Sequence, residues 1–130
     1  MIRIEKQYAV FLENRPGVLA RISQALVKAH INILALSILD TIDHVVVRMV
    51  VDKPQEAEHV LQGLHAMVQV RDVVFMDVAN RVGAVAGIAE RLAESGINIE
   101  YAYCTTSLSN SSGAIVLRTN DLEATINALS

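Results

Sequence analysis

The sequence has few of the features that mark a secreted, membrane or nucleic-acid-binding protein. One cysteine among 130 residues excludes an internal disulfide and a multi-cysteine metal site. No apolar run approaches the ~20 residues of a membrane-spanning helix, and no signal-peptide pattern is visible. A formal net charge of −3 argues against a nucleic-acid-binding surface. We therefore expect a cytoplasmic protein with neither membrane nor nucleic acid as partner.

Aliphatic residues, by contrast, are abundant. Hydrophobic residues make up 52% of the chain, charged residues 19% and aromatic residues only 4%, which excludes intrinsic disorder. The length suits one compact domain or two minimal domains of about 65 residues each. So small a chain cannot easily bury this many aliphatic side chains, and the excess needs an explanation.

The chain contains an internal repeat. Residues 14–33 read NRPGVLARISQALVKAHINI and residues 80–99 read NRVGAVAGIAERLAESGINI, with nine of the twenty positions identical and no gap. Matching N-R-x-G at one end and I-N-I at the other favours duplication over chance similarity of apolar helices. We place unit 1 at residues 1–71 and unit 2 at residues 72–130.

Each unit predicts the same order of elements. In unit 1 we expect strands at residues 5–13, 31–39, 44–51 and 67–71, and helices from Pro16 to His30 and from residue 54 to about 64. This order is β-α-β-β-α-β, the ferredoxin-like pattern. In unit 2 we expect strands at 73–79, 97–107 and 113–118 and helices at 82–95 and 121–129. The last strand of unit 2 is absent, so it was lost or another element takes that edge.

The repeated N-R-x-G segments lie at strand-to-helix turns, where a ligand could bind. A helix N-terminus offers unpaired N–H groups that stabilise a carboxylate or phosphate. Gly17 and Gly83 would let a ligand approach the backbone, and Asn14 and Asn80 can donate and accept hydrogen bonds. Alternatively, the asparagines are turn or cap residues and the glycines are steric necessities.

Asn32 and Asn98 form a second repeated pair. Each interrupts an apolar run at the start of a predicted strand, where asparagine is depleted and a polar side chain needs a partner. Either residue could instead be an exposed strand-end residue. Their presence in both repeats favours a functional role.

The segment Glu13–Leu19, followed by Ile31-Asn32-Ile33, resembles the ACT domain, a family of small regulatory modules that sense amino acids. The resemblance covers most of the chain twice, which implies a tandem-ACT protein with no enzyme attached. It implies an α+β fold in which two ferredoxin-like βαββαβ units share an antiparallel sheet with helices on one face.

The resemblance also implies where a ligand binds. In family members that bind amino acids, two units pair side by side through their second strands. The ligand lies at the seam, between the turn of one unit and the second strand of the other. Two pseudo-equivalent sites follow: Asn14, Pro16 and Gly17 with Asn98, and Asn80, Val82 and Gly83 with Asn32.

Departures from the family pattern make these two sites unequal. Leu12 and Val78 stand where some serine-binding relatives have a histidine, and Val82 replaces the proline. The small residues 84–87 could open room for a larger ligand, or let two helices pack closely. Glu100, Tyr101 and Tyr103 have no polar counterparts in unit 1, and our hypothesis is that they enrich one site.

No other set of residues indicates catalysis. Cys104 has no nucleophile signature, and the four histidines lack metal-ligand spacing. Gly83-x-x-x-Gly87 is not a phosphate loop, and we expect it to let its helix pack close to the sheet. We therefore expect no catalytic residue, metal or cofactor. Two functions stay open: a non-catalytic sensor of an amino acid or similar metabolite, or a ligand-free subunit that associates with an enzyme of amino-acid metabolism.

The predicted strands 31–39 and 44–51 are apolar on both faces. A sheet with one face in water should alternate apolar and polar residues. We therefore predict a homodimer, or a complex, that stacks on the face of the sheet not covered by helices.

Overall fold

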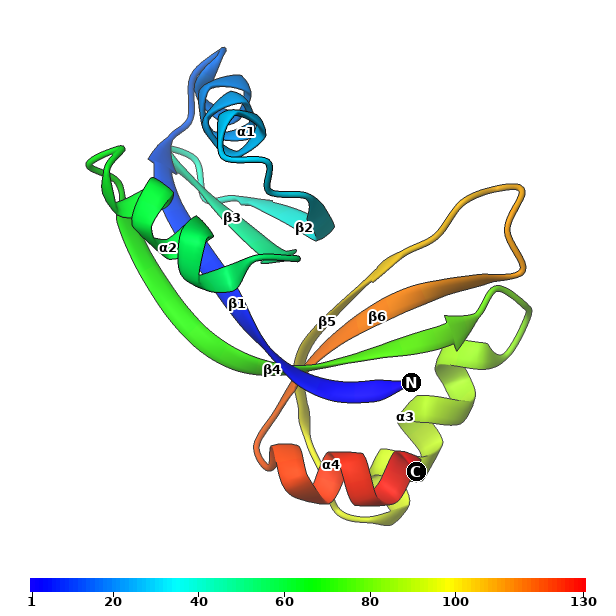
Figure 1. Ribbon diagram of the computed structural model, residues 1–130. Coiled ribbons are helices and arrows are strands. Elements are labelled where there is room, and N and C mark those ends of the chain that lie inside the picture. The colour runs from blue at the N-terminus through cyan, green and yellow to red at the C-terminus, as the bar shows by residue number, and fades with distance from the viewer. The chain divides into compact units, whose positions relative to one another are not determined.

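The computed structural model describes all 130 residues and has an α+β fold with four helices and six strands (Figure 1). The elements are β1 (Ile2–Glu13), α1 (Val18–Lys28), β2 (Ile33–Asp40), β3 (His44–Val51), α2 (Pro54–Gln62), β4 (Met67–Ala79), α3 (Ala84–Glu94), β5 (Ile99–Thr105), β6 (Ser112–Thr119) and α4 (Leu122–Leu129). No helix is long and apolar enough to cross a membrane.

The chain divides into two compact units. The first unit is Lys6–Arg71, and the second unit combines Met1–Glu5 with Asp72–Ser130. The antiparallel strands follow the order β2-β3-β1-β4 in the first unit and β1-β4-β6-β5 in the second. Each unit is therefore ferredoxin-like, as the repeat predicts.

The fourth strand of the second unit comes from the N-terminal end of the chain. The Asp77 amide donates to the Met1 carbonyl at 3.0 Å, and the Met1 ammonium lies 3.2 Å from the Asp77 carboxylate. Ile2 packs against the core of the second unit. The start of β1 therefore takes the edge that the sequence leaves open. Correspondingly, Met67–Arg71 of β4 lies in the first unit.

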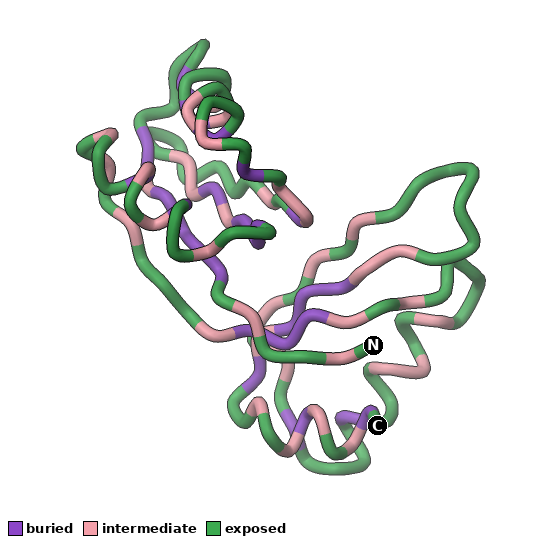
Figure 2. Tube along the Cα trace, viewed as in Figure 1, coloured by how far each residue is buried: buried purple, intermediate pink, exposed green.

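The core of the first unit lies between its strands and the helices α1 and α2. Register partners such as Tyr8 and Met49, or Val10 and Val47, place alternate strand residues on the helix-covered face. The buried residues of this core are Tyr8, Val10, Leu12, Val18, Ile22, Leu26, Ile31, Val47, Met49, Val51, Ala57 and Leu61 (Figure 2). Burial of one such large aliphatic side chain stabilises the fold by about 1.5–3 kcal/mol.

The core of the second unit is smaller. Its buried residues are Val74, Leu92, Ile97, Ile115, Leu117 and Leu129, contributed by β4, α3, β6, α4 and the segment before β5. Partly buried side chains, Ile88 and Ile126 among them, pack around this group. More of this unit's apolar surface thus stays within reach of solvent.

The face of the strands opposite the helices is apolar, as predicted, but much of it is not open. Ala9, Ala35 and Val50 in the first unit, and Phe75 and Val116 in the second, are buried within the single chain. This burial accounts for part of the aliphatic excess.

The second strands do not pair with each other, contrary to the expected arrangement. β2 is hydrogen-bonded to β3 alone and β5 to β6 alone, so both are edge strands. On β2, Leu36, Ile38 and Leu39 are large apolar residues with 39%, 49% and 49% of their surface exposed. The free edges are therefore where another strand could add.

Helix starts also differ from the prediction. Pro16 is not the first helical residue, because Gly17 is the N-cap and α1 begins at Val18. Val82 likewise precedes the N-cap Gly83 and is 99% exposed. A left-handed glycine is incompatible with a helix that begins earlier.

Candidate functional site

The two turn glycines adopt the same backbone conformation, which is strained for residues other than glycine. Gly17 has φ 86° and Gly83 has φ 87°, in the left-handed region that favours glycine. A Cβ built on either residue would meet nothing within 4 Å. The glycines are therefore required by the backbone conformation, and the space in front of the backbone is open to a ligand.

The helix starts beside these glycines are uncapped. Neither α1 nor α3 has a capping side chain or an acidic residue in its first turn. The first N–H groups of a helix lack intrahelical acceptors and carry a partial positive charge. Both turns can therefore receive an anionic group such as a carboxylate.

The turn asparagines use their N–H groups within the fold. The Asn14 Nδ2 donates to Asp40 Oδ1 and to the Ile42 carbonyl, both at 3.2 Å. The Asn80 Nδ2 donates to the carbonyls of Ser107 at 3.2 Å and Asn110 at 2.9 Å. Each amide thus ties its turn to the loop between the second and third strands, which leaves the amide oxygen for a ligand.

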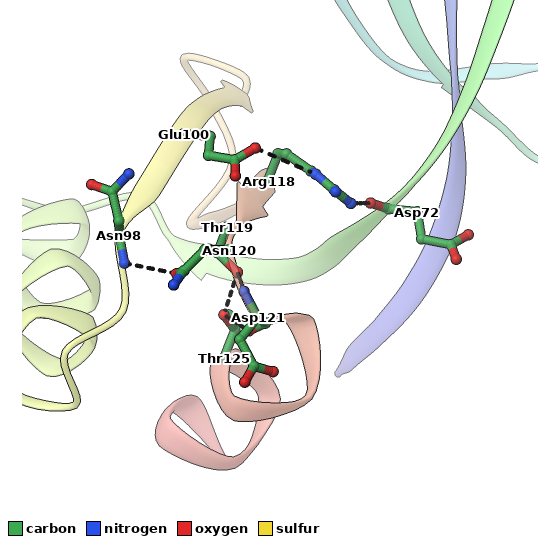
Figure 3. A network of polar contacts seen from close by, with 8 residues as sticks. All are labelled: Asp72, Asn98, Glu100, Arg118, Thr119, Asn120, Asp121 and Thr125. Atoms are coloured by element: carbon green, nitrogen blue, oxygen red, sulfur yellow. Dashed lines mark hydrogen bonds and ion pairs between the residues drawn. The ribbon is translucent and has the colours of Figure 1, made fainter.

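Asn32 and Asn98 lie just before the second strands and make matching backbone bonds. The Asn32 N–H donates to Asp52 Oδ1 at 2.9 Å, and the Asn98 N–H donates to Asn120 Oδ1 at 3.0 Å. Both residues are exposed. Figure 3 shows the side-chain amide of Asn98 directed away from Asn120. These bonds use the backbone N–H groups, and both exposed side chains are therefore available to a ligand.

Within one unit the turn asparagine lies far from the asparagine that precedes the second strand. The Asn14 N–H donates to Asp43, before the first residue of β3, whereas Asn32 bonds to Asp52, after its last residue. An eight-residue strand spans roughly 25 Å, so these residues lie at opposite ends of the sheet. One unit therefore cannot place both of its asparagine side chains on one small ligand.

Cavities lie beside both turns. One of about 180 Å³ lies on the β2 side of α1 and includes Asn14, Leu19 and Ile38 in its lining. Another of about 340 Å³ includes Gly83, Ala84 and Gly87. A Cβ on Gly87 would also meet nothing within 4 Å, so the prediction that this glycine lets the helix pack closely is wrong. The small residues leave open space instead.

Glu100 and Tyr101 lie on β5 near an arginine that the sequence did not single out. The Arg118 Nη1 donates to the Asp72 carbonyl at 2.7 Å, and its Nε lies 3.6 Å from Glu100 Oε1 (Figure 3). Tyr101 is the register partner of Arg118, and Tyr103 that of Val116, on the face opposite α3 and α4. The sequence alone could not place Arg118 beside Glu100 and Tyr101, because this contact depends on the register between β5 and β6.

The remaining candidate chemistry is weak. No group of three His, Cys, Asp or Glu side chains is placed to hold a metal ion. Burial raises the pKa of the Cys104 thiol, which favours the protonated and less nucleophilic form.

Comparisons with known proteins identify the family and the fold. Residues 3–129 match the profile of a family described as an ACT domain pair. The crystal structure of protein BT0572 from Bacteroides thetaiotaomicron shares 32% identity with this chain, at a TM-score of 0.90. The match covers 98% of this chain and 88% of that one. A search of curated proteins gave no match.

Two less similar structures share the fold. The regulatory subunit of aspartate kinase from Thermus thermophilus, in its ligand-free form, is 19% identical with a TM-score of 0.75. That from Thermus flavus is 20% identical with a TM-score of 0.67. Each match covers at least 98% of this chain and 93% of the other.

Proposed function

The chain belongs to the ACT-domain-pair family, and from that premise we propose that it is a non-catalytic, cytoplasmic regulatory protein that binds an amino acid or a similar small metabolite. The observation that carries the proposal is the pair of turns. Each has a left-handed glycine and an uncapped helix start, and a cavity of about 180 Å³ adjoins the turn of the first unit. An amino acid offers the carboxylate that such a helix start stabilises.

We propose the same residues as predicted from the sequence for the two binding sites. Asn14, Pro16 and Gly17 would act with Asn98, and Asn80, Val82 and Gly83 with Asn32. The exposed side chains of Asn32 and Asn98 would bind the amino or carboxylate group. Glu100 and Tyr101 would make the site that contains Asn98 the more selective one.

A second copy of the chain would complete each site. The turn asparagine and the asparagine before the second strand of one unit lie too far apart to share a ligand, and both second strands have a free edge. We propose that these edges pair between copies and form a homodimer, which would also cover the exposed Leu36 and Ile38. Light scattering at micromolar concentration tests this step, and a monomer there would contradict it.

Titration calorimetry against the twenty amino acids tests ligand binding. We expect one or a few to bind, and Asn98→Ala or Asn32→Ala to weaken binding about tenfold or more, since charge-assisted hydrogen bonds contribute ~1.5–3 kcal/mol. Asn127→Ala, an exposed asparagine on α4, is the matched control. A ligand that binds only the folded state must also raise the melting temperature.

The alternative is a regulatory subunit that associates with an enzyme of amino-acid metabolism and binds no ligand. The engagement of both N–H groups of Asn14 and Asn80 within the fold favours it, because these donors are not free for a ligand. Two structures of the same fold are regulatory subunits of aspartate kinase. Absence of binding to all twenty amino acids would support this alternative over the sensor.

A further inference from the structure

A second cavity in the first unit lies on the other side of α1 from the proposed amino-acid site. It has a volume of about 250 Å³ and is bounded by the end of β1, the start of α1, the first residue of β3 and the segment between α2 and β4. We call it the basic cavity. Its charged or ionisable lining residues are Glu13, Arg15, Arg21, His44 and His65.

The basic cavity carries an excess of positive charge. Two arginines and two histidines face one carboxylate, Glu13, which accepts from the Arg15 Nε at 3.1 Å. That ion pair neutralises one arginine and leaves Arg21 as a full positive charge. The imidazole rings of His44 and His65 add further N–H donors.

The exposed side chain of Arg21 reaches across the cavity. Its Nη2 donates to the Leu64 carbonyl at 3.2 Å, a bond that joins α1 to the segment after α2. A guanidinium has five N–H donors, so most remain free after this bond. A fixed guanidinium suits two-point recognition of a carboxylate or phosphate.

The duplicated cavity in the second unit lacks this arrangement. Gly87 and Ala79 stand where the first unit has Arg21 and Glu13. An acidic residue, Asp77, lines the cavity there and pairs with the Met1 ammonium. The duplicated backbone therefore forms a cavity in both units. In the first, Arg21 bonds to the segment after α2, and in the second, Arg81 and Arg91 lie in the lining instead.

We propose that the basic cavity binds a small dianionic metabolite, with Arg21 as its main anchor. Sites for drug-sized ligands run from roughly 300 to 1,000 Å³, so a cavity of this size suits a molecule with few carbon atoms. A short dicarboxylate and a small phosphate monoester both offer two negative charges to an arginine. The rest of the lining is apolar: Phe11, Leu12, Val18, Leu64, Ala66 and Met67.

Titration calorimetry on the full chain tests the proposal with succinate, inorganic phosphate and acetate. We expect succinate or phosphate to bind, acetate to bind more weakly, and Arg21→Ala to weaken binding about tenfold or more. Tighter binding of phosphate would indicate a phosphate monoester, and tighter binding of succinate a dicarboxylate. Arg21→Lys, which keeps the charge but loses the planar fork, should show an intermediate affinity.

Arg91→Ala is the matched control, since Arg91 lines the corresponding cavity of the second unit. Melting temperatures of the variants establish that they are folded. The proposal is overturned if the folded wild-type chain binds neither dianion, if Arg21→Ala binds as tightly as wild type, or if Arg91→Ala loses as much affinity.

Discussion

Val51 and Ala57 of the first unit correspond to Thr119 and Thr125 of the second. Val51 and Thr119 are the register partners of Ile33 and Ile99, which occupy equivalent places in the repeat. In the second unit the two hydroxyls form a buried hydrogen bond of 2.7 Å between β6 and α4 (Figure 3). The same strand-helix contact is thus made by apolar packing in one unit and by a polar pair in the other.

The contrast extends to the strand ends. The backbone of Asn32 bonds to the carboxylate of Asp52, and that of Asn98 bonds to the amide oxygen of Asn120. Either side chain supplies the oxygen that the backbone N–H needs. Duplication has therefore preserved the hydrogen-bond geometry while side-chain chemistry diverged, so exchanges between equivalent positions isolate the effect of each side chain.

The largest expected effect comes from the equivalent core leucines. Leu26→Ala and Leu92→Ala should each lower the free energy of unfolding by about 2–5 kcal/mol, the usual range for buried leucines. Both residues are buried, but the first unit encloses Leu26 in a larger buried cluster. We therefore expect Leu26→Ala to lower the free energy of unfolding more than Leu92→Ala does, as measured by urea denaturation. An equal or larger loss for Leu92→Ala would contradict this ranking.

The next effect concerns the buried threonine pair. Thr125→Ala should lower the free energy of unfolding by about 1–3 kcal/mol, because it leaves the Thr119 hydroxyl without this partner. The double variant Thr119→Val with Thr125→Ala reproduces the residues of the first unit. It should recover most of the lost stability, since replacing both partners can be nearly neutral. A double variant as unstable as the single one would show that the hydrogen bond is not the cause.

Tyr8 gives a smaller effect that depends on pH. Its hydroxyl donates to the Pro54 carbonyl at 2.7 Å, and Tyr8→Phe should cost about 1 kcal/mol at neutral pH. Burial, with a contribution from Glu58, raises the pKa of Tyr8 above its ordinary value. The unfolded chain therefore loses this proton first, and wild-type stability should fall as the pH rises above 10.

Tyr8→Phe removes that contribution, so the difference between the two proteins should shrink in alkaline solution. Denaturation midpoints at pH 7 and pH 10.5 measure it. A difference that stays constant between these two values would contradict the assignment.

The smallest expected effect concerns the ends of α1 and α3. His30 and Gly96 occupy equivalent positions with φ 58° and 70°. Because glycine adopts this conformation without penalty, His30→Gly should stabilise the protein by about 0.5–1 kcal/mol, and Gly96→His should destabilise it by a similar amount. Thermal melts of the two variants check the signs, and loss of stability in His30→Gly would refute the argument.

The repeat and the period of apolar residues predicted the fold because they are local in sequence. The N-R-x-G and I-N-I segments identified both units and the family. The strand neighbours were not local. Pairing of the second strands was expected, whereas the hydrogen bonds place both at sheet edges. The alternation of apolar and polar residues along a strand predicts which face is apolar, but it does not predict which strand lies beside it.

The site was predictable in outline only. The turn conformation of Gly17 and Gly83 follows from the sequence, because few residues other than glycine tolerate it. The roles of Asn14 and Asn80 in tying the turn to a distant loop, and the contact of Arg118 with Asp72, join residues 26 to 46 positions apart. Such contacts depend on tertiary structure, which periodicity does not report.

The double use of β1 and β4 has a consequence for synthesis on the ribosome. All residues of the first unit, Lys6–Arg71, are consecutive, so this unit can close once Arg71 has emerged. The second unit needs Met1–Glu5 as well as Asp72–Ser130, so Met1–Glu5 must stay unpaired until β4 has emerged as far as Asp77. This pairing joins residues 76 positions apart, and long-range pairing is slow to form because the chain between the two strands must first be closed into a loop.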